Sequence, residues 1–245
     1  MSRKPVRRPA SVAARLRPFW FLIAVVVCAA AFAGYYCATW PGFYPKSVTV
    51  NGNRVVASQT IVARAAIERH ENVWLQNMQA AARRVQSIPY VGDVEIHRSL
   101  PAGVHIVVTE RTPYATVRDR GASVVVDRDL RVLERGGSAT QPELITAATL
   151  PSAGAFITDA GTQALLRDYE ALARAHVAAA RLEHDKFGDL VAVTRGGVRL
   201  LLGDESELQR TAQLVDPILS QVAANGRKIA AVDLRAPKTP VVMYK

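Results

Sequence analysis

Residues 91–110, VGDVEIHRSLPAGVHIVVTE, alternate apolar and polar side chains on both sides of a central Pro101. Alternation over two adjacent runs predicts two antiparallel strands, Val91–Arg98 and Val104–Glu110. Folding the stretch about Pro101 pairs Val94 with Val108, and their neighbours two residues away fall on the same face. The hairpin therefore needs other elements to cover that apolar face.

The residues before the hairpin supply such elements. Val48–Val50 has the composition of a strand, and Asn51-Gly52-Asn53 is typical of the turn that ends one. Ser58 is a candidate helix cap. A second helix is predicted to present one apolar face formed by Leu75, Met78, Ala82 and Val85, and to end before Pro89. The resulting order β-α-α-β-β predicts a small α+β domain over residues 45–111.

His97 and His105 lie opposite each other in the predicted hairpin. Two histidines without a third ligand are a weak indication of zinc. A solvated cross-strand pair is the preferred interpretation, so we predict no metal site.

Residues 112–245 carry the pattern of a second, larger unit. Its predicted helices run over Thr162–Val177 and from a capping box at Asp204 and Glu207 to Asn225-Gly226, with Pro217 inside the second. A hairpin is expected across Arg195-Gly196-Gly197. The predicted strands are Tyr114–Asp119, Ser123–Asp127, Arg131–Leu133, Leu190–Thr194, Val198–Leu202, Ile229–Arg235 and Val241–Tyr244. We expect a mixed antiparallel β-domain with two helices.

An uncharged apolar segment precedes both units. The 22 residues Phe19–Trp40 would span about 33 Å as a helix, against about 30 Å of hydrocarbon in a bilayer. Aromatic side chains stand at both ends, as at two membrane interfaces. They are Phe19, Trp20, Tyr35, Tyr36 and Trp40. We predict a single transmembrane helix over 19–40.

Charge predicts the orientation of this helix. Six basic residues and no acid precede Phe19, and Lys46 is the first charge after the span. The positive-inside rule therefore places residues 1–18 in the cytoplasm as a basic tail. Much of the net charge of +10 belongs to this tail, which favours membrane attachment over nucleic-acid binding. A signal peptide cleaved at Ala31-Phe32-Ala33 is the alternative, although the apolar run continues past that point.

The chain carries none of the short motifs that mark common hydrolases or nucleotide-binding sites. Its histidines are few and scattered, so no catalytic set is apparent. We therefore predict a protein without catalytic residues, cofactor or small-molecule substrate. A cell-envelope hydrolase remains the less favoured alternative.

Several short motifs in fixed order resemble one family. Ser47-Val48-Thr49-Val50-Asn51-Gly52, Pro89-Tyr90-Val91 and Glu110-Arg111-Thr112-Pro113 look like the POTRA domain of FtsQ/DivIB cell-division proteins. Leu201-Leu202-Gly203 and Val232-Asp233-Leu234-Arg235 look like the β-domain of that family. With the basic tail and single anchor, the resemblance covers nearly the whole chain.

The resemblance implies a non-enzymatic divisome protein of the inner membrane, with its domains in the periplasm and its place at the division septum. Its partners would be an FtsB–FtsL-like pair, bound through the last strands of the β-domain, and other divisome components. The implied partner-binding residues are Arg235, Ala236, Lys238, Thr239, Val241 and Val242. The chain departs from the family pattern at Asp204, where arginine is frequent, and at Ala236, where an aromatic residue can follow.

A late strand near a sheet edge suits this role, because its unpaired backbone groups can accept a partner strand. Pro237 and Pro240 donate no backbone hydrogen bond, which also favours an edge. Arg235 and Lys238 are candidates for contact with acidic partner residues. The alternative for Arg235 is an ordinary surface ion pair. A POTRA-bearing chaperone or secretion component is the alternative function.

Overall fold

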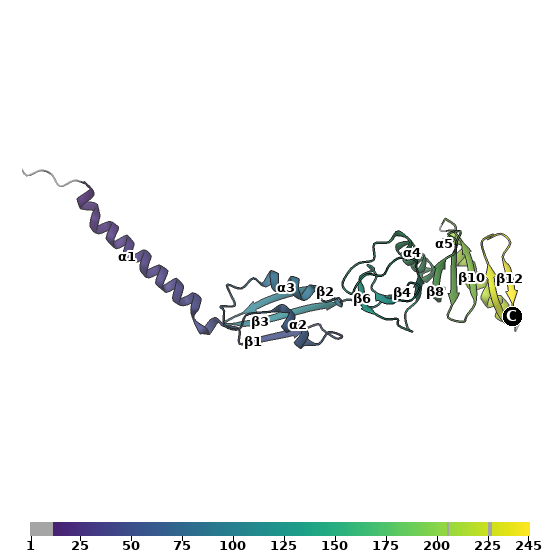
Figure 1. Ribbon diagram of the computed structural model, residues 1–245, viewed down its shortest axis with the longest axis horizontal. Coiled ribbons are helices and arrows are strands. Elements are labelled where there is room, and N and C mark those ends of the chain that lie inside the picture. The colour runs from purple at the N-terminus through teal and green to yellow at the C-terminus, as the bar shows by residue number, and fades with distance from the viewer. Residues whose placement is uncertain (1–11, 205, 225–226) are drawn as a thin grey trace, which may run out of the picture. The chain divides into compact units, whose positions relative to one another are not determined.

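A computed structural model describes residues 12–204, 206–224 and 227–245 (Figure 1). Helix α1 covers Val12–Thr39, and its segment Phe19–Thr39 is long and apolar enough to cross a membrane. A short 3-10 helix, η1, follows at Pro41–Phe43. The single apolar helix predicted at this position is therefore present, ending one residue before Trp40.

The POTRA-like part has the predicted β-α-α-β-β order and contains one small sheet. Its strands lie in the order β1-β3-β2, with β1 parallel to β3 and Val48 opposite Val104. The buried Ile106 and Val108 come from alternate positions of β3, as the sequence pattern requires. The elements are β1 (Ser47–Asn51), α2 (Ser58–Ala65), α3 (Met78–Gln86), β2 (Val91–Ser99) and β3 (Gly103–Glu110).

Two local predictions in this part are wrong. Ser58 is the first residue of α2 rather than its cap, and Ala57 occupies the cap position. Leu75 lies outside α3 and is 71% exposed. Asn77, the residue before α3, caps this helix instead, because its Oδ1 accepts a hydrogen bond from the Ala80 backbone N–H at 2.9 Å.

The chain divides into two compact units. The first comprises residues as far as Gly52, Ala57–Arg84 and Glu95–Val107, and the second comprises Asn53–Val56, Val85–Val94 and Val108–Lys245. Strands β2 and β3 contribute residues to both units.

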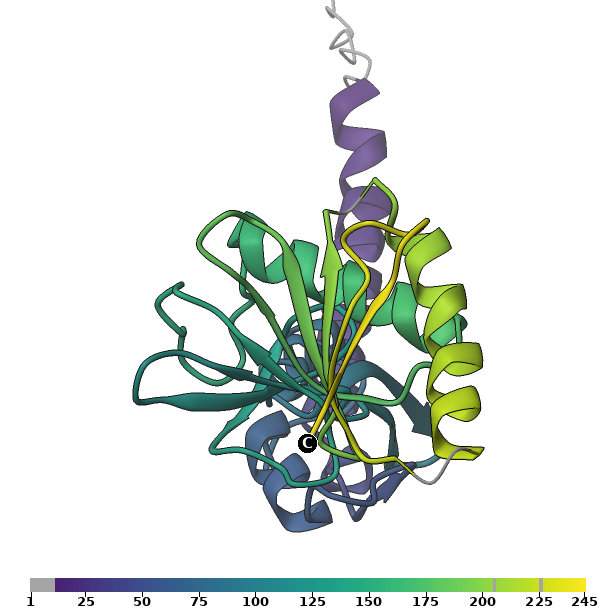
Figure 2. The same cartoon turned by 90° about the vertical axis from the view of Figure 1, so that its right-hand side faces the viewer.

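The second unit is built on a nine-stranded mixed sheet in the order β12-β11-β10-β9-β8-β7-β4-β5-β6. Its parallel pairs are β10 with β11, β4 with β7 and β7 with β8. Helices α4 and α5 pack together and cover one face, α4 over β7 and β8 and α5 over β10 (Figure 2). The elements are β4 (Ala115–Arg118), β5 (Ser123–Val126), β6 (Val132–Arg135), β7 (Glu143–Ile145), α4 (Ala160–Arg174), β8 (Ala179–His184), β9 (Leu190–Thr194), β10 (Arg199–Gly203), α5 (Leu208–Ala224), β11 (Ile229–Asp233) and β12 (Val241–Tyr244).

One cross-strand row forms the centre of the core beneath the helices. Successive register partners along this row are Leu144, Leu182, Ala192, Leu200, Val232 and Val242. All but Val242 are buried, and Val242 packs against the same core from the last strand. Since side chains alternate across a sheet, the next row points away from the helices. That row includes Glu143, Arg181, Arg199 and Met243.

The predicted capping box at Asp204 is a further error. Asp204 Oδ1 accepts hydrogen bonds from the backbone N–H and hydroxyl of Ser206, at 2.9 and 2.6 Å, and the carboxylate also accepts one from the Glu207 backbone N–H, but in a turn that precedes the helix. Helix α5 begins only at Leu208 and contains Pro217, as expected. The predicted helix end at Asn225-Gly226 lies outside the described residues.

Candidate partner-binding edge

Strand β12 is the outermost strand at one end of the large sheet. It pairs with β11 in antiparallel fashion, with Val232 opposite Val242 and Asp233 opposite Val241. Within the described residues, no strand pairs with the other side of β12. A row of backbone groups at this edge is therefore available to another chain.

The side chains of β12 are unusually apolar for a solvent-exposed edge. Val241 is 56%, Met243 43% and Tyr244 47% exposed. Val242 lies on the core side, so Val241 and Met243 share the opposite face. The guanidinium of Arg227 lies 5.2 Å from the centre of the Tyr244 ring. The edge thus combines open backbone groups with apolar and aromatic contact area.

Arg235 follows β11 and is held by its own chain. Its Nη2 lies 2.6 Å from Asp233 Oδ2, and its Nε donates to both carboxylate oxygens at 3.0 and 3.2 Å. This hydrogen bonding lowers the pKa of Asp233 and raises the pKa of Arg235, to which Asp185 and Asp189 also contribute. Arg235 therefore has an intramolecular partner before any protein binds.

The remaining predicted residues form the turn between β11 and β12. Ala236, Lys238 and Thr239 are exposed, and the Thr239 N–H donates to the Ala236 carbonyl at 2.9 Å. Gly203 ends β10, the strand that pairs with β11 on the side away from β12. It has φ +80°, and a Cβ there would lie 3.5 Å from Arg235 Cα. The predicted residues therefore lie together on one hairpin, and their role in binding stays a prediction.

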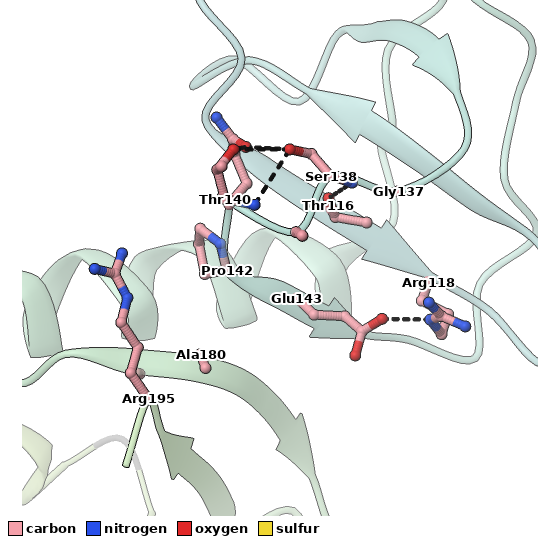
Figure 3. A pocket seen from close by; sticks show the side chains of 12 residues that line it. Thr116, Arg118, Gly137, Ser138, Thr140, Pro142, Glu143, Ala180 and Arg195 are labelled. Carbon is pink, nitrogen blue, oxygen red and sulfur yellow. Dashed lines mark hydrogen bonds and ion pairs between the residues drawn. The ribbon is translucent and has the colours of Figure 1, made fainter. Parts of the chain in front are cut away.

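The sheet face away from the helices contains a polar pocket that the sequence did not reveal. It has a volume of about 830 Å³ and lies beside β4, β7 and β8 (Figure 3). Glu143 accepts from Arg118 Nε on one oxygen and from Arg181 Nε at 2.9 Å on the other. Both carboxylate oxygens are therefore occupied, which disfavours Glu143 as an acid, base or metal ligand.

The two histidines of the small sheet bond to separate partners. His97 Nε2 lies 3.1 Å from Glu95 Oε2. His105 Nδ1 lies 2.7 Å from Thr49 Oγ1, and its Nε2 lies 2.9 Å from Ser99 Oγ. Hydroxyl groups thus occupy both ring nitrogens of His105, which argues against a metal-binding role for this imidazole.

The Glu110-Arg111 pair in the family-like motif has a clear structural role. The Glu110 carboxylate accepts the backbone N–H groups of Arg54, Val55 and Val56 at 3.0, 2.8 and 2.8 Å. Arg111 Nη1 bonds to the carboxylates of Asp127 and Asp129. The motif therefore holds the loop of residues 54–56 in place and forms ion pairs with Asp127 and Asp129.

The aromatic residues predicted at the membrane interfaces lie at both ends of the apolar segment of α1. They are exposed in the isolated chain, from 47% at Trp40 to 69% at Tyr35. The ring of Trp40 also contacts Phe43 edge to face, at 5.2 Å between centres. Their contact with lipid stays a prediction.

Comparisons with known proteins agree with this architecture. Residues 43–111 match the family model described as POTRA domain, FtsQ-type. The chain is 26% identical over 229 residues to the cell-division protein FtsQ of Chloroflexus aurantiacus, covering 90% of this chain and 81% of that protein. It is 23% identical over 222 residues to FtsQ of Neisseria meningitidis, covering 88% of each.

A shorter match is to the cell-division protein DivIB of Clostridium acetobutylicum, 24% identical over 98 residues. This match covers 40% of the chain and about two fifths (39%) of that relative. The POTRA match covers the small sheet, and the two FtsQ relatives align with 90% and 88% of this chain. The FtsQ-type POTRA match and the similarity to these FtsQ and DivIB proteins support the FtsQ/DivIB family of cell-division proteins for this chain.

Proposed function

We propose that this chain is a non-enzymatic divisome protein. Helix α1 anchors it in the inner membrane, and the β12 edge binds an FtsB–FtsL-like pair outside the cytoplasm. Family membership supports the division role. The partners and the binding edge are our inference from the chemistry of the last hairpin.

The unpaired edge of β12 is the observation that carries this proposal. A partner strand laid against it would form backbone hydrogen bonds worth about 0.5–1.5 kcal/mol each. Four residues offer few such bonds, so side-chain contacts must supply most of the affinity. Burying the exposed parts of Val241 and Met243 would add on the order of 1 kcal/mol each.

Charge around the hairpin favours an acidic partner. Residues 227–245 contain five basic side chains, Arg227, Lys228, Arg235, Lys238 and Lys245, and one acidic side chain, Asp233. Asp233 and Arg235 neutralise each other, and Asp185 and Asp189 of the neighbouring hairpin act on Arg235, so Arg227, Lys228, Lys238 and Lys245 give the last hairpin its positive charge. An acidic segment would be attracted to this edge, and a basic one repelled.

A membrane anchor makes a weak edge contact sufficient. Two proteins held in one bilayer meet at a raised effective concentration, so the second contact need not be strong by itself. The basic tail before Phe19 supports an orientation with the folded units in the periplasm. A fluorescent fusion at midcell is the expected result, and uniform envelope signal would contradict the division role.

Charged substitutions test the edge directly. In the full-length chain, Val241→Glu or Met243→Glu should reduce copurification of a co-expressed FtsB–FtsL-like pair by about tenfold or more, which corresponds to about 1.4 kcal/mol. Val55→Glu is the matched control, because Val55 is apolar, 63% exposed and in the same unit but outside the last hairpin. Undiminished capture by both edge variants would reject the proposed edge.

Arg235 needs a double variant because it already pairs with Asp233. Arg235→Glu should weaken binding without unfolding the chain, as expected for a contact with partner acids. If Arg235 serves merely to neutralise Asp233, the double variant Asp233→Asn with Arg235→Ala will bind as well as the unchanged chain. If Arg235 contacts the partner, that double variant will remain weak.

A further inference from the structure

The end of α1 is joined to the loop that precedes α3. Asn72 is buried, and its Nδ2 donates to the carbonyl of Ala38 at 3.2 Å. The neighbouring Val73 N–H donates to the Phe43 carbonyl at 2.9 Å. The first bond satisfies one of the carbonyls that a helix end leaves without an intrahelical partner. This loop is therefore held beside the last turn of the predicted membrane span.

The turn between β2 and β3 is held at the same place. Trp74 Nε1 donates to the Pro101 carbonyl at 3.1 Å, and the Lys46 N–H donates to the Ala102 carbonyl at 3.1 Å. Lys46 follows α1 by seven residues. The loop at residues 72–74 and the turn at Pro101-Ala102 are thus joined by hydrogen bonds to the end of α1 and to the segment that follows it.

An exposed apolar surface results, which we call the juxtamembrane patch: Trp74, Leu100 and Pro101. Leu100 is 79% exposed, the highest value among the large apolar side chains that the structure describes as exposed. Trp74 is 38% exposed, and the guanidinium of Arg98 lies 5.9 Å from its ring centre. Tryptophan with a bonded indole N–H and a neighbouring arginine suits the layer between lipid chains and water.

We propose that the juxtamembrane patch is a second membrane contact, with Leu100 and Trp74 inserted in the interfacial layer of the leaflet where α1 ends. This inference rests on α1 being the membrane anchor of the proposed function. The interfacial layer extends roughly 5–8 Å beyond the hydrocarbon on each side. Groups tied to the chain that directly follows α1 lie within reach of that layer.

The lipid contact is apolar rather than electrostatic. Glu68 and Glu71 are exposed in the loop beside Trp74, and they offset two of the three positive charges of Arg69, Arg98 and Lys46. An anionic headgroup therefore gains little at this position. The occupant that fits is the zwitterionic bilayer itself. Contact of the patch with the bilayer should restrict the orientations that the first folded unit can adopt relative to the membrane surface.

A lipid-quenching experiment on the full-length chain tests this contact. Cys28 and Cys37 are replaced by Ser, and Leu100→Cys is labelled with an environment-sensitive fluorophore in phosphatidylcholine vesicles containing spin-labelled lipid. Val55→Cys is the matched control, since Val55 is apolar, 63% exposed and bonded to Glu110 at the far end of β3. The label at position 100 should be quenched at least about twofold more than the label at position 55.

A second measurement uses the native side chain. In a chain with Trp20→Phe and Trp40→Phe, brominated phosphatidylcholine should quench Trp74 fluorescence, and Leu100→Asp should reduce that quenching by about half. Equal quenching at positions 100 and 55, or Trp74 emission indifferent to brominated lipid, would overturn the contact while leaving the anchor intact. A chain that fails to float with the vesicles would overturn the anchor, and the juxtamembrane patch with it.

Discussion

The Glu110 carboxylate should hold the loop of residues 53–56 in place, and its removal provides the sharpest test of the local structure. Three backbone N–H groups, those of Arg54, Val55 and Val56, point at its two oxygens at 2.8–3.0 Å. Hydrogen bonds to an ionised acceptor contribute about 1.5–3 kcal/mol when they are shielded from water. Glu110→Ala removes all three acceptor contacts at once.

The expected magnitude is well below the sum of three such bonds. Arg54 and Val55 are exposed, so water can take the place of the carboxylate at their N–H groups, whereas Val56 is half-buried. One full contribution and two small ones give about 2–3 kcal/mol for Glu110→Ala. Glu110→Gln keeps a neutral acceptor and should cost about 1–2 kcal/mol.

Amide hydrogen exchange followed by mass spectrometry measures this effect locally. In the detergent-solubilised full chain, the peptide containing residues 53–56 should lose protection on the order of 30- to 150-fold in Glu110→Ala, since each 1.4 kcal/mol is a factor of ten. Glu95→Ala is the matched control, because Glu95 is an exposed acid on β2 that pairs with His97. Unchanged protection in Glu110→Ala would refute the reasoning.

The same contact has a defined pH dependence. Burial raises the pKa of Glu110, but hydrogen bonds from Val55, Val56 and Arg54 outweigh it and hold the pKa below the ordinary 4.5. A carboxylate with a lowered pKa in the folded state stabilises fully above the unfolded value. Protection of residues 53–56 should therefore be constant above about pH 5 and fall as the pH drops below 4.5. Glu110→Ala should show no such fall.

Three further substitutions separate buried contacts from exposed ones. Asp127→Ala should lower the free energy of unfolding by about 2–4 kcal/mol in denaturant titration, because it leaves Arg111 with only the exposed Asp129 and removes the acceptor of the buried Arg131 backbone N–H. Leu200→Ala should cost about 2–5 kcal/mol in the same titration, since Leu200 is fully buried under α5. Arg181→Ala should cost less than about 1 kcal/mol, because the Arg181 side chain is 55% exposed and Glu143 keeps its ion pair with Arg118.

Long alternating runs were predictable from the sequence because their burial follows a local rule. The strand predicted at Val241–Tyr244 has those bounds in the structure, and the hairpin of β2 and β3 differs by one residue at an end. Strand β7 was missed because three residues are too few for a period to show. Its buried position depends on pairing with β4 and β8, which lie far from it in sequence.

The predicted helix boundaries were wrong where apolar spacing continued past the residues that cap or end the helix. The predicted helix from Thr162 to Val177 continues past Arg174, the last residue of α4, and His176 has a positive φ of 62° just beyond it. The following strand β8 was missed, since its alanines are equally compatible with a helix. Asn77 was the informative cap in the small domain, whereas the apolar Leu75 led to an early start.

The position of the candidate edge could be predicted, but the state of its arginine could not. Asp233 and Arg235 are two residues apart in extended chain, which brings their side chains to the same side. The spacing alone permits the ion pair that the structure contains, and it equally permits two free charges. Neighbouring acids at Asp185 and Asp189 belong to another hairpin, so no local pattern could reveal their influence on Arg235.

An open apolar edge poses a problem of self-association, and the last hairpin has features that oppose it. A second copy pairing with β12 would bring the basic side chains of two hairpins together, so charge repulsion disfavours it. The strand is also short, and Pro237 and Pro240 prevent the ladder from extending into the turn. An acidic strand meets the same short ladder but not the charge repulsion. The composition that keeps the edge from binding its own copy is therefore the same composition that selects an acidic partner.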